Sequence, residues 1–356
     1  MSDKAPDFLA VLEGFDGVGV VVRRDQPTGT WIFCVIHDDT LGPATGGCRM
    51  KVYDHPVDGL VDALRLAQGM TNKWAAMDFP FGGGKTVLAI PRPLAQEERR
   101  GLLHRFGALL NSLGGRYGTG ADLGTTTEDM QTIAEVSEYV IGVHGRTDGP
   151  MDPSPYTALG VLEGIRSAVR HKFESADLGG RRILVQGVGS VGAGLATDLA
   201  AEGAHLLISD IDEARARALA ERLSGEFVPT GEVYSTPCDV YAPCAIGATL
   251  GPDTIPLLQC AIVAGAANNQ LQRPADADAL HERGILYAPD YVINGGGAMA
   301  FTSIYQGVDD LDELDRRVRA IGTSLGGIFA EAAMAARSPV VSAQALADRV
   351  LARGPK

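Results

Sequence analysis

The first half of the chain alternates between short runs of β-forming residues and longer amphipathic stretches. Residues 18–25 and 30–39 are rich in Val, Ile, Phe and Trp, and the sequence Gln-Pro-Thr-Gly between them predicts a β-hairpin. Apolar residues then recur at the helical period over 58–77, where Asp58 is the expected N-cap. The other predicted elements of this half are a strand over 85–90, which Pro91 ends, and helices over 95–113 and 126–141. The pattern indicates a mixed α/β region.

The second half follows a different pattern, in which strands alternate with helices. A helix is expected over 156–173, after a hinge rich in Pro, Gly and Asp over 146–155. The predicted strands lie in 181–187, 205–210, 238–245, 260–267 and 284–294. This alternation predicts a doubly wound parallel sheet. We therefore expect an α/β protein with domains over 1–148 and 149–330, and a helical segment over 331–356 that packs back on the first domain.

The composition is that of a globular protein, with 45% hydrophobic and 21% charged residues. The formal net charge of −13 argues against nucleic acid or an anionic membrane as a partner. No apolar run reaches the roughly 18 residues that a membrane helix needs, and the N-terminus does not have the pattern of a signal peptide. The cysteines are scattered without a C-x-x-C pair, and the histidines show no metal-ligand spacing. We expect reduced thiols, a cytoplasmic location and no metal site.

The run Phe79–Ile90 contains Gly-Gly-Gly-Lys-Thr and raises the question of a phosphate-binding P-loop. That motif needs a glycine five positions before the glycine that precedes the lysine. Counted back from Gly84, this position is Phe79, and no buried strand leads into it. A nucleotide hydrolase of the P-loop class is therefore excluded, and Lys85 needs another explanation.

A second glycine pattern meets its structural requirements. Gly187, Gly189 and Gly192 follow the spacing G-x-G-x-x-G, with Ser190 and Val191 inside it, between a predicted strand and a predicted helix. The first glycine permits a tight turn, the second lets the backbone approach a pyrophosphate, and the third lets the helix pack on the strand. These residues therefore predict a Rossmann-type cofactor site at a helix N-terminus. The alternative is a structural glycine turn that binds nothing.

Asp210 ends the next predicted strand, where a carboxylate binds the ribose hydroxyls of NAD. It is followed by Ile211, Asp212 and Glu213, and the first arginine after it is Arg215. A 2′-phosphate would meet negative charge at this place. The sequence therefore predicts NAD as the cofactor rather than NADP.

The first half also carries charged residues in glycine-rich surroundings. An oxidoreductase acting on an amino acid needs a cation for the α-carboxylate and a group that moves protons at the amine, and Lys73, Lys85 and Asp122 could supply them. A lysine near another cation and shielded from water has a lowered pKa, which suits a general base. Each residue also has an ordinary explanation, as a lysine that reaches solvent, a solvated strand end and a turn residue.

Eight segments of the sequence are informative when they are considered together, in the order in which they occur along the chain. They are "LGPATGGCRM", "ALRLAQGMTNKWAAMDFPFGGGKTV", "GRYGTGADLGTTTEDM", "PSPYTALGV", "VQGVGSVG", "YAPCAIGA", "VAGAANNQL" and "GILYAPDYVINGGG". In these segments the sequence resembles the Glu/Leu/Phe/Val amino-acid dehydrogenase family over nearly its whole length. The resemblance implies a substrate-binding and catalytic first domain, a Rossmann NAD-binding second domain and a homo-oligomer. It also implies reversible oxidative deamination of an L-amino acid to its 2-oxo acid and ammonia.

The resemblance implies a role for each matching residue. Lys73 would bind the α-carboxylate, Lys85 would be the general base that activates water, and Asp122 would move protons on the departing ammonia. Gly46 and Gly47 would offer backbone amides near the substrate. The residues that would line the nicotinamide side of the cleft are Thr157, Ala242, Pro243, Cys244, Asn268 and Asn294.

The sequence departs from the family pattern in a few places. The usual Asn-Ala-Gly-Gly is here Asn-Gly-Gly-Gly over 294–297, which loosens the backbone beside the nicotinamide. Thr45 stands where an apolar residue is common, and Phe301 replaces a smaller aliphatic residue at the pocket wall. The last two departures affect the choice of substrate rather than the chemistry.

The substrate side chain is expected to be large and apolar. The stretch Gln68–Met70 lacks the lysine that would bind a glutamate side chain. Gly120 and Ala298 are small and leave room for a ring, which slightly favours phenylalanine, whereas Phe301 would fill that space and restore an aliphatic preference. The alternatives are a leucine or valine dehydrogenase and, from a different class, a non-catalytic NAD-binding sensor.

Overall fold

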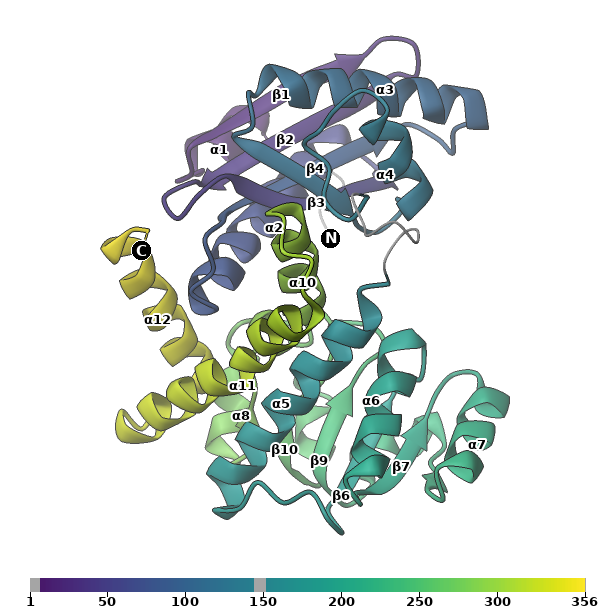
Figure 1. The fold of residues 1–356 in the computed structure, drawn as a ribbon, viewed down its shortest axis with the longest axis vertical. Coiled ribbons are helices and arrows are strands. Elements are labelled where there is room, and N and C mark those ends of the chain that lie inside the picture. Colours follow the sequence, from purple (N-terminus) through teal and green to yellow (C-terminus); the bar gives the residue numbers. More distant parts are fainter. Residues whose placement is uncertain (1–6, 144–151, 356) are drawn as a thin grey trace. The chain divides into compact units, whose positions relative to one another are not determined.

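The computed structural model describes residues 7–143 and 152–355, which form two compact units (Figure 1). Unit 1 contains residues 1–151, 304–307 and 347–356, and unit 2 contains residues 152–303 and 308–346. The domain boundary expected after residue 148 lies outside the described residues and stays a prediction, as does most of the hinge. At the C-terminal end, α11 (Leu311–Met334) continues across residue 331, and α12 (Pro339–Arg353) is divided between the two units.

Unit 1 is built on a five-stranded sheet with the order β1-β2-β4-β3-β5. Its strands are β1 (Gly19–Asp25), β2 (Thr30–Asp38), β3 (Ala44–Val52), β4 (Gly82–Ile90) and β5 (Tyr117–Ala121). Its helices are α1 (Phe8–Glu13), α2 (Pro56–Ala76), α3 (Gln96–Ser112) and α4 (Thr127–Ala134). β1 and β2 form the predicted hairpin, β2 is also antiparallel to β4, and β3 is parallel to both β4 and β5. The sheet is therefore mixed, and the strand β3 lies between β4 and β5.

Helices cover both faces of this sheet because its central strands bury side chains in both directions. On one face, Phe33 and Val87 pack with Leu60 of α2. On the other face, Leu88 packs with Phe106 of α3, and α4 joins the same core. The sheet is thus a rigid layer, and the residues on β3, β4 and β5 are held in fixed positions.

The ends of two unit 1 helices differ from expectation. α2 begins at Pro56, where proline is favoured at the start of a helix, so Asp58 is not the N-cap. Its carboxylate instead accepts a hydrogen bond of 3.1 Å from the amide of His55. α4 ends at Ala134, well before the expected residue 141.

Unit 2 contains a six-stranded parallel sheet with the order β11-β10-β9-β6-β7-β8. Its strands are β6 (Arg182–Gln186), β7 (His205–Ser209), β8 (Glu226–Phe227), β9 (Cys238–Pro243), β10 (Cys260–Val263) and β11 (Leu286–Tyr287). Unit 2 also contains α11, most of α10 (Gly296–Tyr305) and part of α12. Its other helices are α5 (Ser154–Phe173), α6 (Ser190–Ala201), α7 (Glu213–Arg222), α8 (Asp276–Glu282) and α9 (Asp290–Ile293), with the short 3-10 helices η1 (Thr230–Ser235) and η2 (Ile255–Leu257). This strand order is that of the dinucleotide-binding fold, and it confirms the predicted α/β class.

α5 and α6 cross one face of this sheet in Figure 1, while η1, η2 and α8 pack on the other. The strand expected over 284–294 was wrong beyond Tyr287: Pro289, which has no amide hydrogen for a strand ladder, ends it and caps α9.

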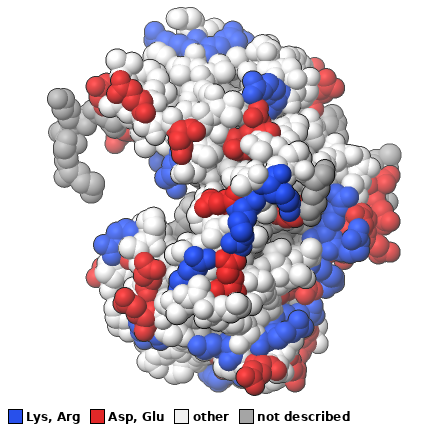
Figure 2. Space-filling model, turned by 90° about the vertical axis from the view of Figure 1, so that its left-hand side faces the viewer, with Lys and Arg blue, Asp and Glu red and all other residues white. Residues whose placement is uncertain are grey.

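Acidic and basic side chains lie interspersed on the face of the molecule that Figure 2 draws. In the part of the chain that the structure describes, no helix has both the length and the hydrophobicity of a membrane span.

Candidate active site

Lys85 lies inside strand β4, and its side chain is only 6% exposed. The glycines before it explain how a lysine comes to be buried there. A Cβ added at Gly83 would lie 2.1 Å from the amide nitrogen of Thr71 in α2, and one at Gly84 would lie 2.7 Å from the ring of Tyr117. The glycines therefore allow the helix and a neighbouring aromatic ring to pack directly on the strand.

Asp122 follows β5 directly, and its Oδ2 lies 3.1 Å from Nζ of Lys85. β3 runs between β4 and β5, so the two side chains meet across the middle strand. They meet at Gly47: a Cβ added there would lie 2.7 Å from Cβ of Asp122 and 3.3 Å from Nζ of Lys85. The missing side chain of Gly47 thus provides the space in which the ion pair forms.

Both members of the pair have lowered pKa values, for different reasons. For Lys85, burial is the largest cause, Arg49 acts in the same direction, and Asp122 opposes them. For Asp122, burial alone would raise the pKa, but the nearby cations Lys85 and Arg49 outweigh it. The site therefore combines an ionised carboxylate with a lysine that loses its proton more readily than a free lysine does.

The other unit 1 candidates lie on the elements around this pair. Gly120 of β5 pairs in register with Gly47. Lys73 lies in the last turn of α2, the helix that packs on β4. The carbonyl of Gly46 accepts hydrogen bonds from Tyr117 and from Thr119, and a Cβ at Gly46 would overlap the carbonyl oxygen of Gly84. Close packing of strands therefore explains Gly46, while its expected amide contact with substrate stays a prediction.

Sequence reasoning missed Arg49, which donates a hydrogen bond of 2.8 Å from Nε to Oδ2 of Asp122. Arg49 also contacts Asp62 of α2, which is likewise absent from the predicted set. The alternation of side chains along β3 could have revealed it, because Gly47 and Arg49 are two residues apart and face the same side of the sheet.

In unit 2, the glycine fingerprint forms the turn from β6 to α6. Gly187 has a φ of 91°, which favours glycine, and a Cβ at Gly192 would lie 1.9 Å from the carbonyl oxygen of Gly187. Gly189 caps α6, whose first residues are Ser190 and Val191, and a Cβ at Gly189 would meet no described protein atom within 4 Å. The turn thus has the tight bend, the close helix packing and the open backbone that a pyrophosphate requires.

Asp210 lies at the end of β7 beside this turn, but its surroundings differ from expectation. Its Oδ2 accepts a hydrogen bond of 2.7 Å from the amide of Val188, and its Oδ1 accepts bonds from the amide of Asp212 at 2.9 Å and from Nη2 of Arg215 at 2.7 Å. Burial acts to raise the pKa of Asp210, but these hydrogen bonds and the charge of Arg215 lower it. Arg215, the first arginine after the acidic run, is therefore in contact with the carboxylate.

Residues expected near the nicotinamide form contacts within unit 2. Nδ2 of Asn294 donates to Oδ1 of Asn268 at 2.7 Å, and a Cβ at Gly297 would lie 2.5 Å from Oγ1 of Thr157. Ala242 and Pro243 end β9, and the amide of Cys244 donates to the carbonyl oxygen of Gln186 at 2.7 Å. Ala298 and Phe301 both lie on α10. Asn294 and Gly295 join α9 to α10, and Gly296 and Gly297 are the first two residues of α10.

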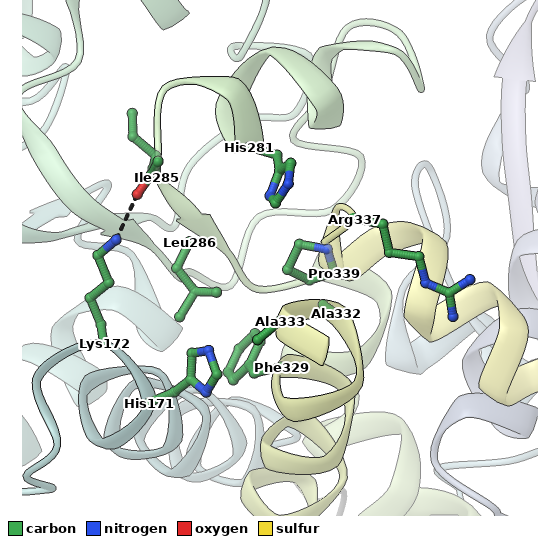
Figure 3. A pocket seen from close by; sticks show the side chains of 11 residues that line it. His171, Lys172, His281, Ile285, Leu286, Phe329, Ala332, Ala333, Arg337 and Pro339 are labelled. Carbon is green, nitrogen blue, oxygen red and sulfur yellow. Dashed lines mark hydrogen bonds between the residues drawn. The ribbon is translucent and has the colours of Figure 1, made fainter. Parts of the chain in front are cut away.

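Unit 2 also contains a cavity of about 190 Å³ away from the glycine turn, between α5, α8, β11 and α11 (Figure 3). Its wall includes His171, Lys172, His281 and Arg337. Nζ of Lys172 donates to the carbonyl oxygen of Gly284 at 2.7 Å. Nη2 of Arg337 lies 2.5 Å from Oε1 of Glu331. Lys172 thus joins α5 to the turn before β11, while Arg337 is paired with the last turn of α11. Among the described residues, no group of three or more His, Cys, Asp or Glu could hold a metal ion.

Two family models match the chain. Residues 20–139 match the family model described as Glu/Leu/Phe/Val dehydrogenase, dimerisation domain, and residues 207–306 match the one described as Glutamate/Leucine/Phenylalanine/Valine dehydrogenase.

Similar proteins cover most of the chain. Leucine dehydrogenase of Bacillus subtilis is 44% identical over 82% of this chain and 80% of its own. Valine dehydrogenase of Streptomyces albus is 36% identical over 94% of this chain and 92% of its own. The crystal structure of L-tryptophan dehydrogenase from Nostoc punctiforme superposes with a TM-score of 0.86 at 35% identity, covering 97% of this chain and 98% of that one. The chain belongs to the Glu/Leu/Phe/Val amino-acid dehydrogenase family.

Proposed function

We propose that the protein catalyses the reversible, NAD-dependent oxidative deamination of a large apolar L-amino acid. The observation that carries this proposal is the buried pair of Lys85 and Asp122, because a water-shielded lysine with a lowered pKa beside an ionised carboxylate suits the proton transfers of this reaction. The family membership of the chain supports the same reaction.

The residues of unit 2 fit a nicotinamide dinucleotide. The open backbone at Gly189 and the N-terminus of α6 would hold the pyrophosphate, and Asp210 would lie near the adenosine ribose. Asn268, Asn294 and Thr157 would lie toward the nicotinamide. When bound, the cofactor accepts the hydride that leaves Cα of the amino acid. NAD is our proposal over NADP because three acidic residues lie over 210–213, although Arg215 beside Asp210 reduces their repulsion of a phosphate.

The residues of unit 1 would then carry out the hydrolysis. Lys73 would bind the α-carboxylate of the substrate. Lys85 would take a proton from water as the water oxygen adds to the iminium carbon, which gives a carbinolamine. Asp122, 3.1 Å from Lys85, would pass that proton to the nitrogen, which leaves Lys85 neutral again. As the C–N bond breaks and ammonia leaves, Lys85 would take the proton of the hydroxyl group, and the 2-oxo acid forms. Burial of Lys85 excludes competing water and strengthens these charge interactions.

The candidates for the apolar substrate are phenylalanine and, as the alternative, leucine or valine, since a relative that is 36% identical to this chain is named valine dehydrogenase. The small residues Gly120 and Ala298 favour an aromatic ring and so phenylalanine. Leucine is favoured because relatives that are 40% to 44% identical to this chain are named leucine dehydrogenase. A relative named L-tryptophan dehydrogenase, at 41% identity, accepts the larger ring within the same family. We also propose a homo-oligomer, since the N-terminal family model is described as a dimerisation domain.

The test is a panel of L-amino acids offered with NAD and with NADP at mildly alkaline pH, while the absorbance of the reduced cofactor is followed. We expect turnover with phenylalanine, leucine or valine and none with their D-enantiomers, which serve as matched controls. Binding of NADH without turnover of any L-amino acid would contradict the proposal and favour a non-catalytic NAD-binding sensor.

A further inference from the structure

Arg49 joins the carboxylate of Asp122 to helix α2. Its Nε donates a hydrogen bond of 2.8 Å to Oδ2 of Asp122, and its Nη1 donates one of 2.8 Å to Oδ2 of Asp62. The side chains of Arg49 and Asp62 are each only 16% exposed. The guanidinium thus uses separate nitrogens to bridge two partly buried carboxylates on different elements of the fold.

Asp62 is itself held in place by other side chains. The hydroxyl of Tyr53 donates to its Oδ2 at 2.7 Å, and Nη2 of Arg65 donates to its Oδ1 at 2.9 Å. Burial acts to raise the pKa of Asp62, but these hydrogen bonds and Arg49 lower it, so the carboxylate stays ionised. Asp62 is therefore a fixed negative partner for Arg49.

Arg49 and Lys85 bind the same atom, Oδ2 of Asp122. This matters because a general base changes its charge during the reaction. When Lys85 gives up its proton, Asp122 loses one of its two cationic partners, and a half-buried carboxylate with none would favour its protonated form. Arg49 remains protonated throughout, so it can hold Asp122 ionised and in place while Lys85 is neutral.

We propose that Arg49, anchored by Asp62, is a positioning residue that keeps Asp122 ionised and aimed at Lys85 in both charge states of the lysine. The proposal rests on the proposed function, because it gives Lys85 and Asp122 their roles in proton transfer. Arg49 acts through Asp122 and is not itself assigned a contact with substrate.

The identity of the residue as arginine follows from this geometry. A lysine has one nitrogen, and it cannot repeat the two separate donations that Nε and Nη1 make to Asp122 and Asp62. Replacement by lysine would preserve the charge but lose the bridge, whereas glutamine would lose both. The pair of variants therefore separates the effect of charge from that of position.

The test compares Arg49→Gln, Arg49→Lys and a matched control, Arg65→Gln. Arg65 also pairs with Asp62, but on the other oxygen, and its side chain is 56% exposed. We expect kcat at mildly alkaline pH to fall at least about tenfold in Arg49→Gln, with a smaller change in KM for the amino acid, because Lys73 would still bind the α-carboxylate. Arg65→Gln should stay within about twofold of the wild type, because Tyr53 and Arg49 would still donate to Oδ2 of Asp62.

The pH profile distinguishes a positioning role from a merely structural one. The titratable groups around Lys85 are Asp122, Arg49 and the buried thiol of Cys48, with Asp62 and Tyr53 behind Arg49. Loss of the Arg49 cation favours protonation of Lys85, so the acid limb of kcat/KM should move to higher pH in Arg49→Gln. Arg49→Lys should restore the position of the limb but not the full kcat.

A second measurement does not depend on turnover. The rate at which a small amine-reactive reagent labels Lys85, followed by peptide mass spectrometry as a function of pH, reports its proton affinity directly. We expect the midpoint of labelling to rise in Arg49→Gln and to stay unchanged in Arg65→Gln, with both variants folded by circular dichroism. An unchanged midpoint together with an unchanged pH profile of turnover would overturn the proposal. A raised midpoint in an enzyme that oxidises no amino acid would support the link between Arg49 and Lys85 while contradicting the proposed function.

Discussion

Gly47 lies directly beside Asp122, so close that a Cβ added to the glycine would be 2.7 Å from Cβ of the aspartate. The same added carbon would be 3.3 Å from Nζ of Lys85. The ion pair that would carry the chemistry therefore exists only because the middle strand of the sheet has no side chain at that position.

This relationship predicts the effect of Gly47→Ala. The methyl group must displace Asp122 or Lys85, so we expect kcat to fall at least about tenfold, which corresponds to about 1.4 kcal/mol in the activation free energy. Gly19→Ala on β1, where an added Cβ meets no described atom within 4 Å, is the control and should keep wild-type kcat. Steady-state kinetics of both variants would check this, and a Gly47→Ala enzyme with normal kcat would show that the close pair is not needed.

The pKa directions predict the pH dependence of oxidative deamination. In the proposed mechanism neutral Lys85 is the active form. Burial lowers the pKa of Lys85, so kcat/KM should rise with pH and level off below the ordinary pKa of lysine, about 10.5. Asp122→Asn removes the anion that favours the protonated lysine, so the acid limb should move to lower pH while kcat falls. The substrate amine titrates identically in both enzymes, so the comparison isolates Lys85. A limb that moved to higher pH in Asp122→Asn would mean that Lys85 is not the titrating group.

The contact between Arg215 and Asp210 predicts how cofactor choice can be changed. Asp210→Ser should free the guanidinium of Arg215 for a 2′-phosphate and raise the ratio of NADP to NAD use by at least about tenfold, or 1.4 kcal/mol. The double variant Asp210→Ser/Arg215→Ala should lose most of that gain. The measurement is kcat/KM with NAD and with NADP for both variants. An equal ratio of NADP to NAD use in the single and the double variant would show that Arg215 does not face the ribose.

Gly120→Ala tests the substrate pocket. An added Cβ would lie 3.5 Å from the carbonyl oxygen of Ile141, an ordinary contact, so the fold should be preserved. If Gly120 faces the substrate side chain, the methyl group should lower kcat/KM for phenylalanine by about 10- to 200-fold, or 1–3 kcal/mol. The decrease in kcat/KM for leucine should be smaller. The check is kcat/KM for phenylalanine and for leucine, measured with the wild type and with Gly120→Ala. An unchanged ratio would place Gly120 away from the side chain and leave Phe301 as the residue that sets pocket depth.

The sequence was most informative where the relevant residues are consecutive. The hairpin over 18–39, the alternation of strands and helices after residue 181 and the fingerprint from Gly187 to Gly192 are local patterns, and the structure has all of them. Two local predictions were wrong at an element's end. α2 begins at Pro56 rather than after Asp58, and the last expected strand has only two residues because it ends before Pro289.

The contacts between distant residues could not be read in the same way. Lys85 and Asp122 meet because β3 lies between β4 and β5, and hydrophobic periodicity does not fix the order of strands. Arg49 depends on Asp62 of a helix, and Arg215 reaches Asp210 because the chain turns into α7 between them. Resemblance to the family supplied the residues that are expected to be catalytic, but only the fold shows which charges surround them.

The most direct test of the account is kcat of Lys85→Ala, measured beside NADH binding and beside Lys51→Ala, an exposed lysine of β3. The account predicts that Lys85→Ala loses more than nine-tenths of wild-type kcat, an effect above about 1.4 kcal/mol, while its affinity for NADH changes little because Lys85 lies in unit 1 and the glycine turn in unit 2. Lys51→Ala should match the wild type in both respects. A Lys85→Ala enzyme that kept more than a tenth of wild-type kcat would contradict the role of this lysine as the general base.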